Sequence, residues 1–213
     1  MTPGKRIFDI LFSIYLMLFL SPVIAVIIWK LWRQGGGTIF YGSERMKTAT
    51  QSFILWKFRT MHADASDGGV TGGDKVWRIT PLGHALRRRR LDELPQLWNI
   101  LRGDVSFVGP RPPLRRYVDM HPDLYAEILK SRPGVTGLAS LIYAPHEGRL
   151  LAQTRTPEET ETVYTRVCIP RKAELDLMYQ RNRTFWMDLK LIGWTTAKFF
   201  PKRLRPTRKG RWV

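Results

Sequence analysis

The chain has 213 residues, which corresponds to one domain of ordinary size. Its 35 Lys and Arg residues outnumber 18 Asp and Glu residues, and the resulting net charge of +17 predicts an anionic partner, namely nucleic acid, phospholipid or a phosphorylated substrate. Cys168 is the single cysteine, which excludes an intrachain disulfide and a zinc cluster built from cysteines.

Residues 7–29 form an almost wholly apolar segment, long enough to cross a bilayer, which takes about 20 helical residues. Ser21 and Pro22 near its middle predict a break, because proline lacks an N–H and clashes with the carbonyl of Leu18. Ser21 can bond back to the freed backbone. Basic residues flank both ends, which favours a hairpin that enters and leaves by the cytoplasmic face. We therefore predict a re-entrant helix-break-helix over residues 1–34, with a single spanning anchor as the alternative.

The apolar segment contains one acidic residue, Asp9, close to its N-terminal end. A carboxylate is costly in hydrocarbon, so we expect it to pair with Lys5 or Arg6 at the membrane interface. Stabilisation by the helix dipole, which favours negative charge near a helix N-terminus, is an equally good explanation.

The rest of the chain predicts a mixed α/β fold that is mainly helical. Aromatic and aliphatic runs predict a small β-hairpin, and helical spacing of apolar residues predicts several short helices. The aromatic, lysine-containing segment 185–200 suits the bilayer interface as an amphipathic helix. In chain order we predict strands at 38–41 and 52–59, a Gly/Asp-rich loop at 64–75, helices at 80–86, 92–101, 117–130, 158–165 and 173–181, an extended segment at 105–108, turns at 109–113 and 132–137, and a basic tail at 202–211.

Two adjacent carboxylates, Asp92 and Glu93, are the strongest candidates for chemistry. We expect them at the start of the helix 92–101, with Asp92 as its cap and Pro95 in its first turn. Alone, such a pair is usually a solvated helix start, but here it follows the arginine run 87–90. Carboxylates among so many cations can hold Mg²⁺ together with substrate phosphates, or can attack phosphorus as a covalent nucleophile.

Several basic residues are placed to bind phosphate. Arg111 lies between two prolines, so a rigid turn directs its guanidinium, which binds phosphate oxygens in a bidentate manner. Lys57 and Arg59 lie in an apolar predicted strand. The run from Arg87 to Arg90 is open to two interpretations, since it can bind substrate or anionic lipid.

The order of these motifs resembles the bacterial sugar transferase family, whose members are monotopic phosphoglycosyl transferases that begin glycan assembly on undecaprenyl phosphate. The resemblance covers about residues 5–198. Its motifs are the Ser-Pro break in the apolar run, KFRTM, LDELPQLWNILRGDVSFVGPRP, RPGVTGL, ELDLMY and MDLKL.

The resemblance implies roles for individual residues. Asp92 is the expected nucleophile, which attacks the sugar-bearing phosphorus of a UDP-sugar, releases UMP and carries a phosphosugar to polyprenyl phosphate. Mg²⁺ is the expected cofactor, held by Asp92 and Glu93. Arg111 matches the phosphate-binding arginine of the family, and Arg87 and Asp188 fall at matching polar positions; with Lys57 and Arg59 these are the predicted substrate-binding residues.

The resemblance also implies an organisation and a location. Residues 1–34 are expected in the membrane, residues 35–200 form the catalytic domain, and residues 201–213 form the basic tail. The expected location is the bacterial inner membrane, with the active site on its cytoplasmic face. The expected partners are a UDP-sugar, polyprenyl phosphate and anionic phospholipid, without nucleic acid; a homodimer is a possible further partner that the sequence does not decide.

Two segments depart from the pattern of the family. Residues 138–143 read LASLIY where WAQVNGR is usual, and residues 44–47 read ERMK where N-R-x-G is usual. Both fall where the nucleotide-sugar pocket is expected, and they leave the sugar undetermined.

Two other function classes compete with this interpretation. The charge and the aromatic, basic C-terminal part also suit a membrane-anchored binding protein without catalysis, although no nucleic-acid-binding motif is present. A lipid-phosphate phosphatase or a polytopic transferase is the second alternative, and the single strong apolar segment argues against the polytopic form.

Overall fold

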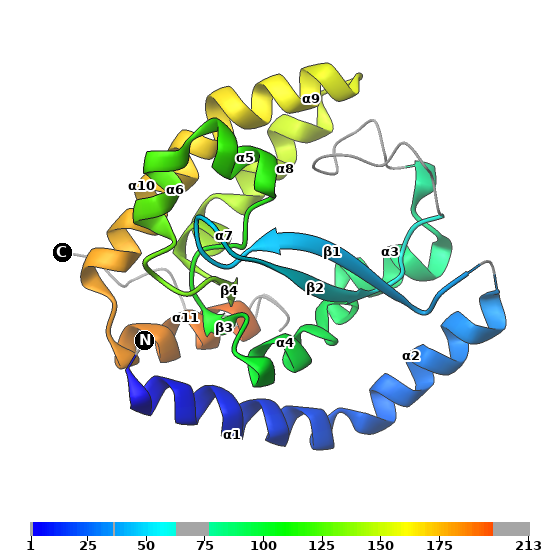
Figure 1. Cartoon of the computed structure of the whole chain (residues 1–213). Coiled ribbons are helices and arrows are strands. Elements are labelled where there is room, and N and C mark those ends of the chain that lie inside the picture. Colours follow the sequence, from blue (N-terminus) through cyan, green and yellow to red (C-terminus); the bar gives the residue numbers. More distant parts are fainter. Residues whose placement is uncertain (1, 36, 63–76, 198–213) are drawn as a thin grey trace.

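The computed structural model of the protein describes residues 2–35, 37–62 and 77–197 (Figure 1). Two consecutive helices, α1 and α2, form a long bent rod along one edge of the molecule. The remaining elements gather on one side of this rod, and a β-hairpin crosses the middle of them (Figure 1). The fold therefore separates a helical rod from a mainly helical body that contains a small antiparallel sheet, as predicted.

The elements follow the chain in this order: α1 (Pro3–Phe19), α2 (Ser21–Gln34), β1 (Phe40–Met46), β2 (Ser52–Phe58), α3 (Pro81–Arg88), the 3-10 turn η2 (Leu91–Glu93), α4 (Gln96–Arg102), β3 (Ser106–Val108), α5 (Arg115–Met120), α6 (Pro122–Ile128), β4 (Gly134–Thr136), α7 (Leu138–Ile142), α8 (Ala144–Ala152), α9 (Pro157–Val163), the π-helical turn η3 (Tyr164–Cys168), α10 (Ile169–Asn182) and α11 (Phe185–Ala197).

The predicted break in the apolar segment is confirmed. The axes of α1 and α2 differ by 62°, and Leu20 is the single residue between them. Pro22 lies in the first turn of α2, where a missing N–H costs nothing. The Ser21 hydroxyl donates to the Leu18 carbonyl at 2.7 Å, so it satisfies the group that the proline leaves without a partner.

Neither α1 nor α2 alone is long and apolar enough to span a membrane, and the bent pair passes this test only when both are taken together. The pair has two faces. Its body-facing side buries two polar residues, Asp9 and Ser13, and two apolar residues, Ile27 and Leu31. The other side exposes large apolar side chains, among them Ile7, Leu11, Leu18, Phe19, Val26, Trp29 and Trp32.

The expected partner of Asp9 was wrong. Its carboxylate is 1% exposed and accepts a hydrogen bond from the backbone N–H of Phe107 at 3.5 Å. Lys5 instead forms an ion pair with Asp188, and Arg6 donates to the carbonyls of α4. Asp9 therefore attaches the rod to the body, because the backbone of strand β3 lies close enough to donate a hydrogen bond to its carboxylate.

The β-hairpin pairs β1 with β2 in an antiparallel register from Phe40 opposite Phe58 to Met46 opposite Ser52. The prediction for β2 is confirmed, whereas the strand predicted at 38–41 starts too early and is too short. Residues 42–45 are polar and lack an apolar signal, yet they pair fully because one face of the hairpin is exposed.

A second, parallel pair joins β3 to β4, so the turn predicted at 132–137 contains a strand. The extended segment predicted at 105–108 corresponds to β3. The two strands approach so closely that a Cβ added at Gly109 would overlap the backbone of Arg132, and one at Gly134 would overlap Gly109. Because glycine has no side chain, these residues allow β3 and β4 to pair closely. The sequence has no alternating apolar pattern there, so this strand pair was not predicted.

Prolines also divide two of the predicted helices. The helix predicted at 92–101 is the short turn η2 followed by α4, which begins only after Pro95, so Asp92 does not cap it. The helix predicted at 117–130 is split into α5 and α6, because His121 adopts an extended φ of −137° before Pro122 starts the second helix.

The C-terminal helices complete the body. Helices at 80–86, 158–165 and 173–181 are confirmed as α3, α9 and α10 with shifted ends, and α11 matches the first part of the segment 185–200. Helices α7 and α8 were not predicted. The loop 64–75, residues 198–200 and the tail 202–211 lie outside the described residues.

Candidate active site

The carboxylate pair lies in η2, between the end of α3 and the start of α4. Arg90, which precedes this turn, has a left-handed backbone with φ 54° and ψ 23°, and helix α3 has ended just before it. Asp92 is 7% exposed, and the Glu93 side chain is 11% exposed. A tight turn, rather than a helix start, therefore buries both carboxylates at the boundary between α3, α4 and strand β2.

Three cations surround Glu93. Its Oε1 atom lies 3.4 Å from Lys57 Nζ and 3.5 Å from Arg111 Nη2, and its Oε2 atom lies 3.6 Å from Arg90 Nη1. Burial alone would raise the pKa of Glu93, but Arg111, Lys57 and Arg90 together lower it to about 2. Glu93 is therefore a permanent anion that holds three basic side chains beside its neighbour.

Asp92 has a different environment. No ion pair joins its carboxylate to any of the residues in 2–35, 37–62 and 77–197. Burial, and then the charge of Glu93, raise its pKa, whereas Lys57 and Arg87 act in the opposite direction. Adjacent carboxylates whose pKa values are pushed apart are typical of a site with two roles. Asp92 is the more basic and less encumbered of the two, as a nucleophile requires.

The segment predicted as a rigid turn around Arg111 is a bend at residues 109–110 followed by irregular backbone, and backbone hydrogen bonds hold it on both sides. The Gly109 N–H donates to the Thr136 carbonyl at 2.9 Å, and the Gly134 N–H donates to the Pro110 carbonyl at 2.8 Å. On the other side of Arg111, the Pro113 carbonyl accepts from the Met46 N–H at 3.0 Å. Contacts with β4 and β1 therefore hold the segment on both sides of the arginine and direct it to Glu93.

The arginine run separates into residues that face the pair and residues that face outward. The Arg87 Nε atom donates to Thr60 Oγ1 at 2.8 Å, and its charge lowers the pKa of Asp92. Arg88, Arg89 and Arg90 are all exposed, and Arg90 nevertheless contacts Glu93. The two ends of the run thus lie close to the carboxylate pair.

A cavity of about 260 Å³ is lined by Lys57 and Arg111, at what we call its mouth, and by residues of α6, α8, η3 and α10; Asp92 and Glu93 are not among its lining residues. Arg45 of β1 also lines it, and its Nε atom is buried without a hydrogen-bond partner within the described part of the chain. The complete lining is Arg45, Lys57, Arg111, Pro112, Pro113, Tyr125, Ile128, Glu147, Leu151, Tyr164, Ile169, Lys172, Ala173 and Asp176.

The mouth of this cavity carries an excess of positive charge. Burial, followed by the charge of Arg111, lowers the pKa of Arg45 to about 10 and that of Lys57 to about 8. Cations whose charged form is disfavoured by burial and by a neighbouring positive charge are stabilised by a bound anion. Arg45 was missed as a site residue, although its place in the segment that replaces N-R-x-G was the available signal.

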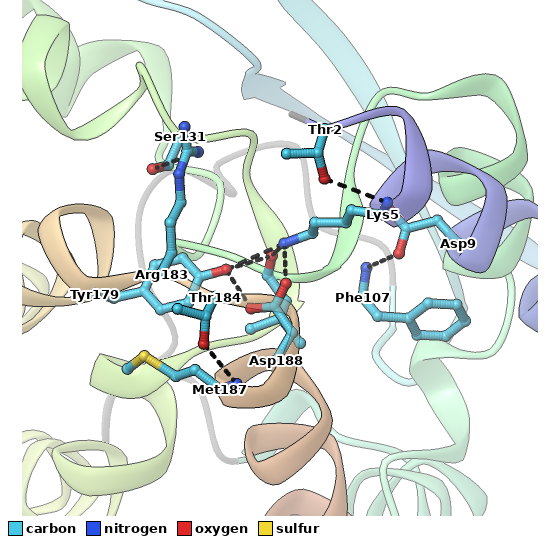
Figure 2. A network of polar contacts seen from close by, with 11 residues as sticks. Thr2, Lys5, Asp9, Phe107, Ser131, Tyr179, Arg183, Thr184, Met187 and Asp188 are labelled. Carbon is cyan, nitrogen blue, oxygen red and sulfur yellow. Dashed lines mark hydrogen bonds and ion pairs between the residues drawn. The ribbon is translucent and has the colours of Figure 1, made fainter.

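Two predicted substrate-binding residues have other contacts. Arg59 donates to the Gly35 carbonyl at 2.5 Å, after the end of α2. Asp188 of α11 lies 2.7 Å from Lys5 Nζ and accepts a hydrogen bond from the Tyr179 hydroxyl at 2.6 Å (Figure 2). The structure does not bring these two side chains into contact with Asp92 or Glu93.

The Asp188 contacts form a network that joins both ends of the chain. Lys5 Nζ also donates to the Val108 carbonyl at 2.9 Å, and Asp188 is 5% exposed. Val108 precedes the Gly109 turn that leads to Arg111. The ion pair thus ties α1 and α11 to the base of this turn. The structural contacts of Asp188 account for a polar residue at this buried position.

The carboxylate pair provides a restricted set of metal ligands. Among the described residues, no cluster of three or more His, Cys, Asp or Glu side chains is placed to hold a metal ion. Within the described part of the chain, the carboxylate oxygens at this site come from Asp92 and Glu93, which fits Mg²⁺, since it commonly binds one or two carboxylates together with waters and substrate phosphates. The pair therefore fits a metal that arrives with its phosphorylated substrate.

The family model described as "Bacterial sugar transferase" matches residues 2–202. The chain belongs to this family. Membership confirms the resemblance found in the motifs, and with it the prediction of an enzyme of the phosphoglycosyl transferase type. It also argues against the alternative interpretation, in which the net positive charge belongs to a binding protein without catalysis.

Named relatives include enzymes with stated substrates. The chain is 33% identical to "Uncharacterized sugar transferase EpsL" of Bacillus subtilis over 194 residues, which are 91% of this chain and 86% of that protein. It is 32% identical over 204 residues to the UDP-glucose:undecaprenyl-phosphate glucose-1-phosphate transferase of Klebsiella pneumoniae. It is 30% identical over 215 residues to the undecaprenyl-phosphate galactose phosphotransferase of Salmonella typhimurium. The last two alignments include 92% and 93% of this chain but only 40% of each relative.

Proposed function

We propose that the protein transfers a sugar 1-phosphate from a UDP-sugar to undecaprenyl or a related polyprenyl phosphate and releases UMP, as the first membrane step of bacterial glycan synthesis, such as that of an exopolysaccharide, O-antigen, capsule or glycoprotein. The observation that carries this proposal is the buried pair of Asp92 and Glu93, ringed by cations at the mouth of a basic cavity. The names of the Klebsiella and Salmonella relatives support the substrate classes.

In the proposed reaction, an Asp92 oxygen attacks the sugar-bearing phosphorus and forms an acyl phosphate, while the bond from that phosphorus to the oxygen of UMP breaks. UMP leaves with that oxygen. An oxygen of polyprenyl phosphate then attacks the same phosphorus, the bond to Asp92 breaks, and the carboxylate is regenerated. Both steps keep atoms and charge in balance without a further reactant.

The surrounding residues support each step. Arg111 and Lys57 neutralise the phosphate oxygens, and Glu93 orients both cations through its ion pairs. Asp92 and Glu93 would hold Mg²⁺ with the diphosphate, and the ion would supply further neutralisation of the charge on the leaving group. Arg87 acts on the other side of Asp92, where it favours the ionised form of the nucleophile.

A direct assay tests this function. The purified chain in lipid nanodiscs, supplied with Mg²⁺, undecaprenyl phosphate and a panel of UDP-sugars, is expected to release UMP over many turnovers from at least one donor. Chelation of Mg²⁺ with EDTA is expected to stop the release, and added Mg²⁺ to restore it. Absence of UMP from every donor, with lipid and metal present, would contradict the proposal.

We further propose that α1 and α2 form a re-entrant element in the bacterial inner membrane, with the active site on the cytoplasmic face. The exposed apolar side of the bent pair, together with Asp9 and Ser13 buried on its body-facing side, supports this arrangement. The exposed Arg88 and Arg89 suit anionic lipid head groups at the same interface, at roughly 1 kcal/mol for each residue near the surface.

Labelling of introduced cysteines tests the topology. Residues Thr2 and Thr38 lie before α1 and after α2, and the natural Cys168 is buried. We expect cysteines at positions 2 and 38 to react only after cells are lysed, because both ends face the cytoplasm. Pro22→Ala is expected to shift part of the population to a spanning form, since it removes the break. Opposite accessibility of the two sites in the unaltered chain would mean that the segment spans the membrane.

A further inference from the structure

The cavity that begins at Lys57 and Arg111 ends in a second group of polar side chains, far along the chain from the carboxylate pair. Lys172 of α10 donates to Glu147 of α8 at 3.0 Å and to the hydroxyl of Tyr164 in η3 at 3.1 Å. Asp176 follows one turn after Lys172 on α10. The mechanism described above uses none of these four residues. Together they form the inner end of the cavity.

Asp176 is the unusual member of this group. It is 7% exposed, and no hydrogen bond or ion pair joins it to any residue that the structure describes. Burial raises its pKa to about 7, and the charge of Lys172 only partly opposes this rise. A buried carboxylate without a partner destabilises a fold, so its place in the wall of a cavity points to a ligand that completes it.

The position of the cavity indicates which part of a nucleotide sugar lies there. The phosphate to be transferred must sit by Asp92, between Lys57 and Arg111. UMP departs after the first step and a lipid phosphate takes its place, so that side of the phosphorus has to remain open. The sugar stays attached between the two steps, and a cavity that adjoins the same cations suits it. At about 260 Å³ the cavity lies near the lower end of ligand pockets, at roughly 300–1,000 Å³, as expected for part of a larger donor.

The chemistry of the inner end also matches a sugar. Sugar hydroxyls both donate and accept hydrogen bonds, and here Asp176 and Glu147 accept while Lys172 donates. The apolar faces of a sugar ring require apolar or aromatic walls, which Tyr125, Leu151 and other lining residues provide. A nucleobase would instead need a flat aromatic slot with backbone donors, which this group of charged side chains does not resemble.

We propose that the inner end of the cavity binds the sugar ring of the donor, with Asp176 as an acceptor for sugar hydroxyls and the Lys172–Glu147 pair as a second contact. The inference rests on the proposed function. It makes these three residues determinants of which UDP-sugar the enzyme accepts. Glu147 lies in α8, shortly after the segment 138–143 that departs from the family pattern, and Lys172 and Asp176 lie in α10.

Asp176→Asn tests the assignment, with Glu174→Gln as a matched control, because Glu174 lies on the same helix with an exposed side chain. UMP release from UDP-glucose, UDP-galactose, UDP-GlcNAc and UDP-GalNAc is measured for each form. For the preferred donor we expect Asp176→Asn to lower kcat/KM about 10- to 100-fold and to change the ratio between donors. Inhibition by UMP, which lacks the sugar, is expected to stay within about twofold of the original value. Glu147→Gln is expected to alter the donor ratio in the same assay.

Three results would overturn the assignment. Equal loss with all four donors together with weaker inhibition by UMP would place Asp176 at the nucleotide. Unchanged kinetics in both Asp176→Asn and Glu147→Gln would remove the residues from the site. A lower Tm of Asp176→Asn at pH 8 would make the carboxylate a structural partner. Absence of UMP release by the unaltered protein with every donor would instead refute the proposed function itself.

The expected direction of the Tm change follows from proton binding. Between pH 3.8 and about 7 the folded state holds a proton on Asp176 that the unfolded state has lost, so stability falls as pH rises through this window. Lys172 is the charged group coupled to it; the neutral phenol of Tyr125, whose pKa is raised mainly by burial, also faces it. Asparagine has no charge to bury, so the Tm of the Asp176→Asn variant at pH 8 is expected to equal or exceed that of the unaltered protein. Below pH 4 the difference in Tm between the two proteins is expected to be smaller.

Discussion

Asp92→Asn is expected to abolish UMP release and to remove a covalent phosphosugar adduct from the protein. The unaltered enzyme, given a UDP-sugar and Mg²⁺ without lipid, is expected to release UMP in up to stoichiometric amount, and mass spectrometry of its peptides is expected to place the phosphosugar on residue 92. An amide is a poor nucleophile toward phosphorus, so the isosteric asparagine keeps the packing of the buried site while it removes the reaction. Steady-state rates at several fixed lipid concentrations are expected to give parallel lines, as for a two-step transfer.

The carboxylates need separate controls because they share one cluster of charges. Glu93→Gln removes the anion that pairs with Lys57 and Arg111. Turnover is also expected to stop, in this case because the two cations lose the partner that holds them in position. Asp119→Asn is the matched control, since Asp119 is exposed on α5 and is expected to leave the rate unchanged. An adduct that persists in Asp92→Asn, or intersecting lines in the rate plots, would point to a direct transfer in which the pair only holds metal.

The parts of the site that the sequence predicted are those encoded by neighbouring residues. The break at Ser21 and Pro22 depends on local backbone chemistry, and the turn at Arg111 depends on the two prolines around it. The Asp92 and Glu93 pair was recognised as a motif, yet its local conformation was predicted wrongly. Helical spacing of Leu94, Leu97 and Leu101 outweighed the effect of a proline that delays the helix to residue 96.

The cavity could not be predicted because distant segments build it. Arg45 reaches the site only through the pairing of β1 with β2 and the contact between Met46 and Pro113. Asp176 belongs to the ELDLMY motif, whose spacing indicates a helix but not what the carboxylate faces. Conversely, Asp188 matched a family position, and its side chain pairs with Lys5 at the far end of the chain. In each case the decisive information is tertiary contact, which residue spacing does not contain.

Arg111→Lys is expected to lower kcat/KM by about 100-fold or more, comparable to the loss of one preorganised donor at a developing oxyanion. The guanidinium uses Nη2 to contact Glu93 at 3.5 Å and has further N–H groups for phosphate oxygens, and its side chain is 37% exposed at the cavity mouth. Lysine keeps the charge but has a single ammonium, so it cannot hold Glu93 and present a planar fork to phosphate at once. Arg115→Lys is the matched control, because Arg115 is four residues further on and pairs with Glu44 at the surface. Membrane association, measured by co-sedimentation with liposomes, is expected to be unchanged in both variants. Near-normal turnover in Arg111→Lys would show that charge alone is sufficient at this position, and the bidentate contact would then have to be abandoned.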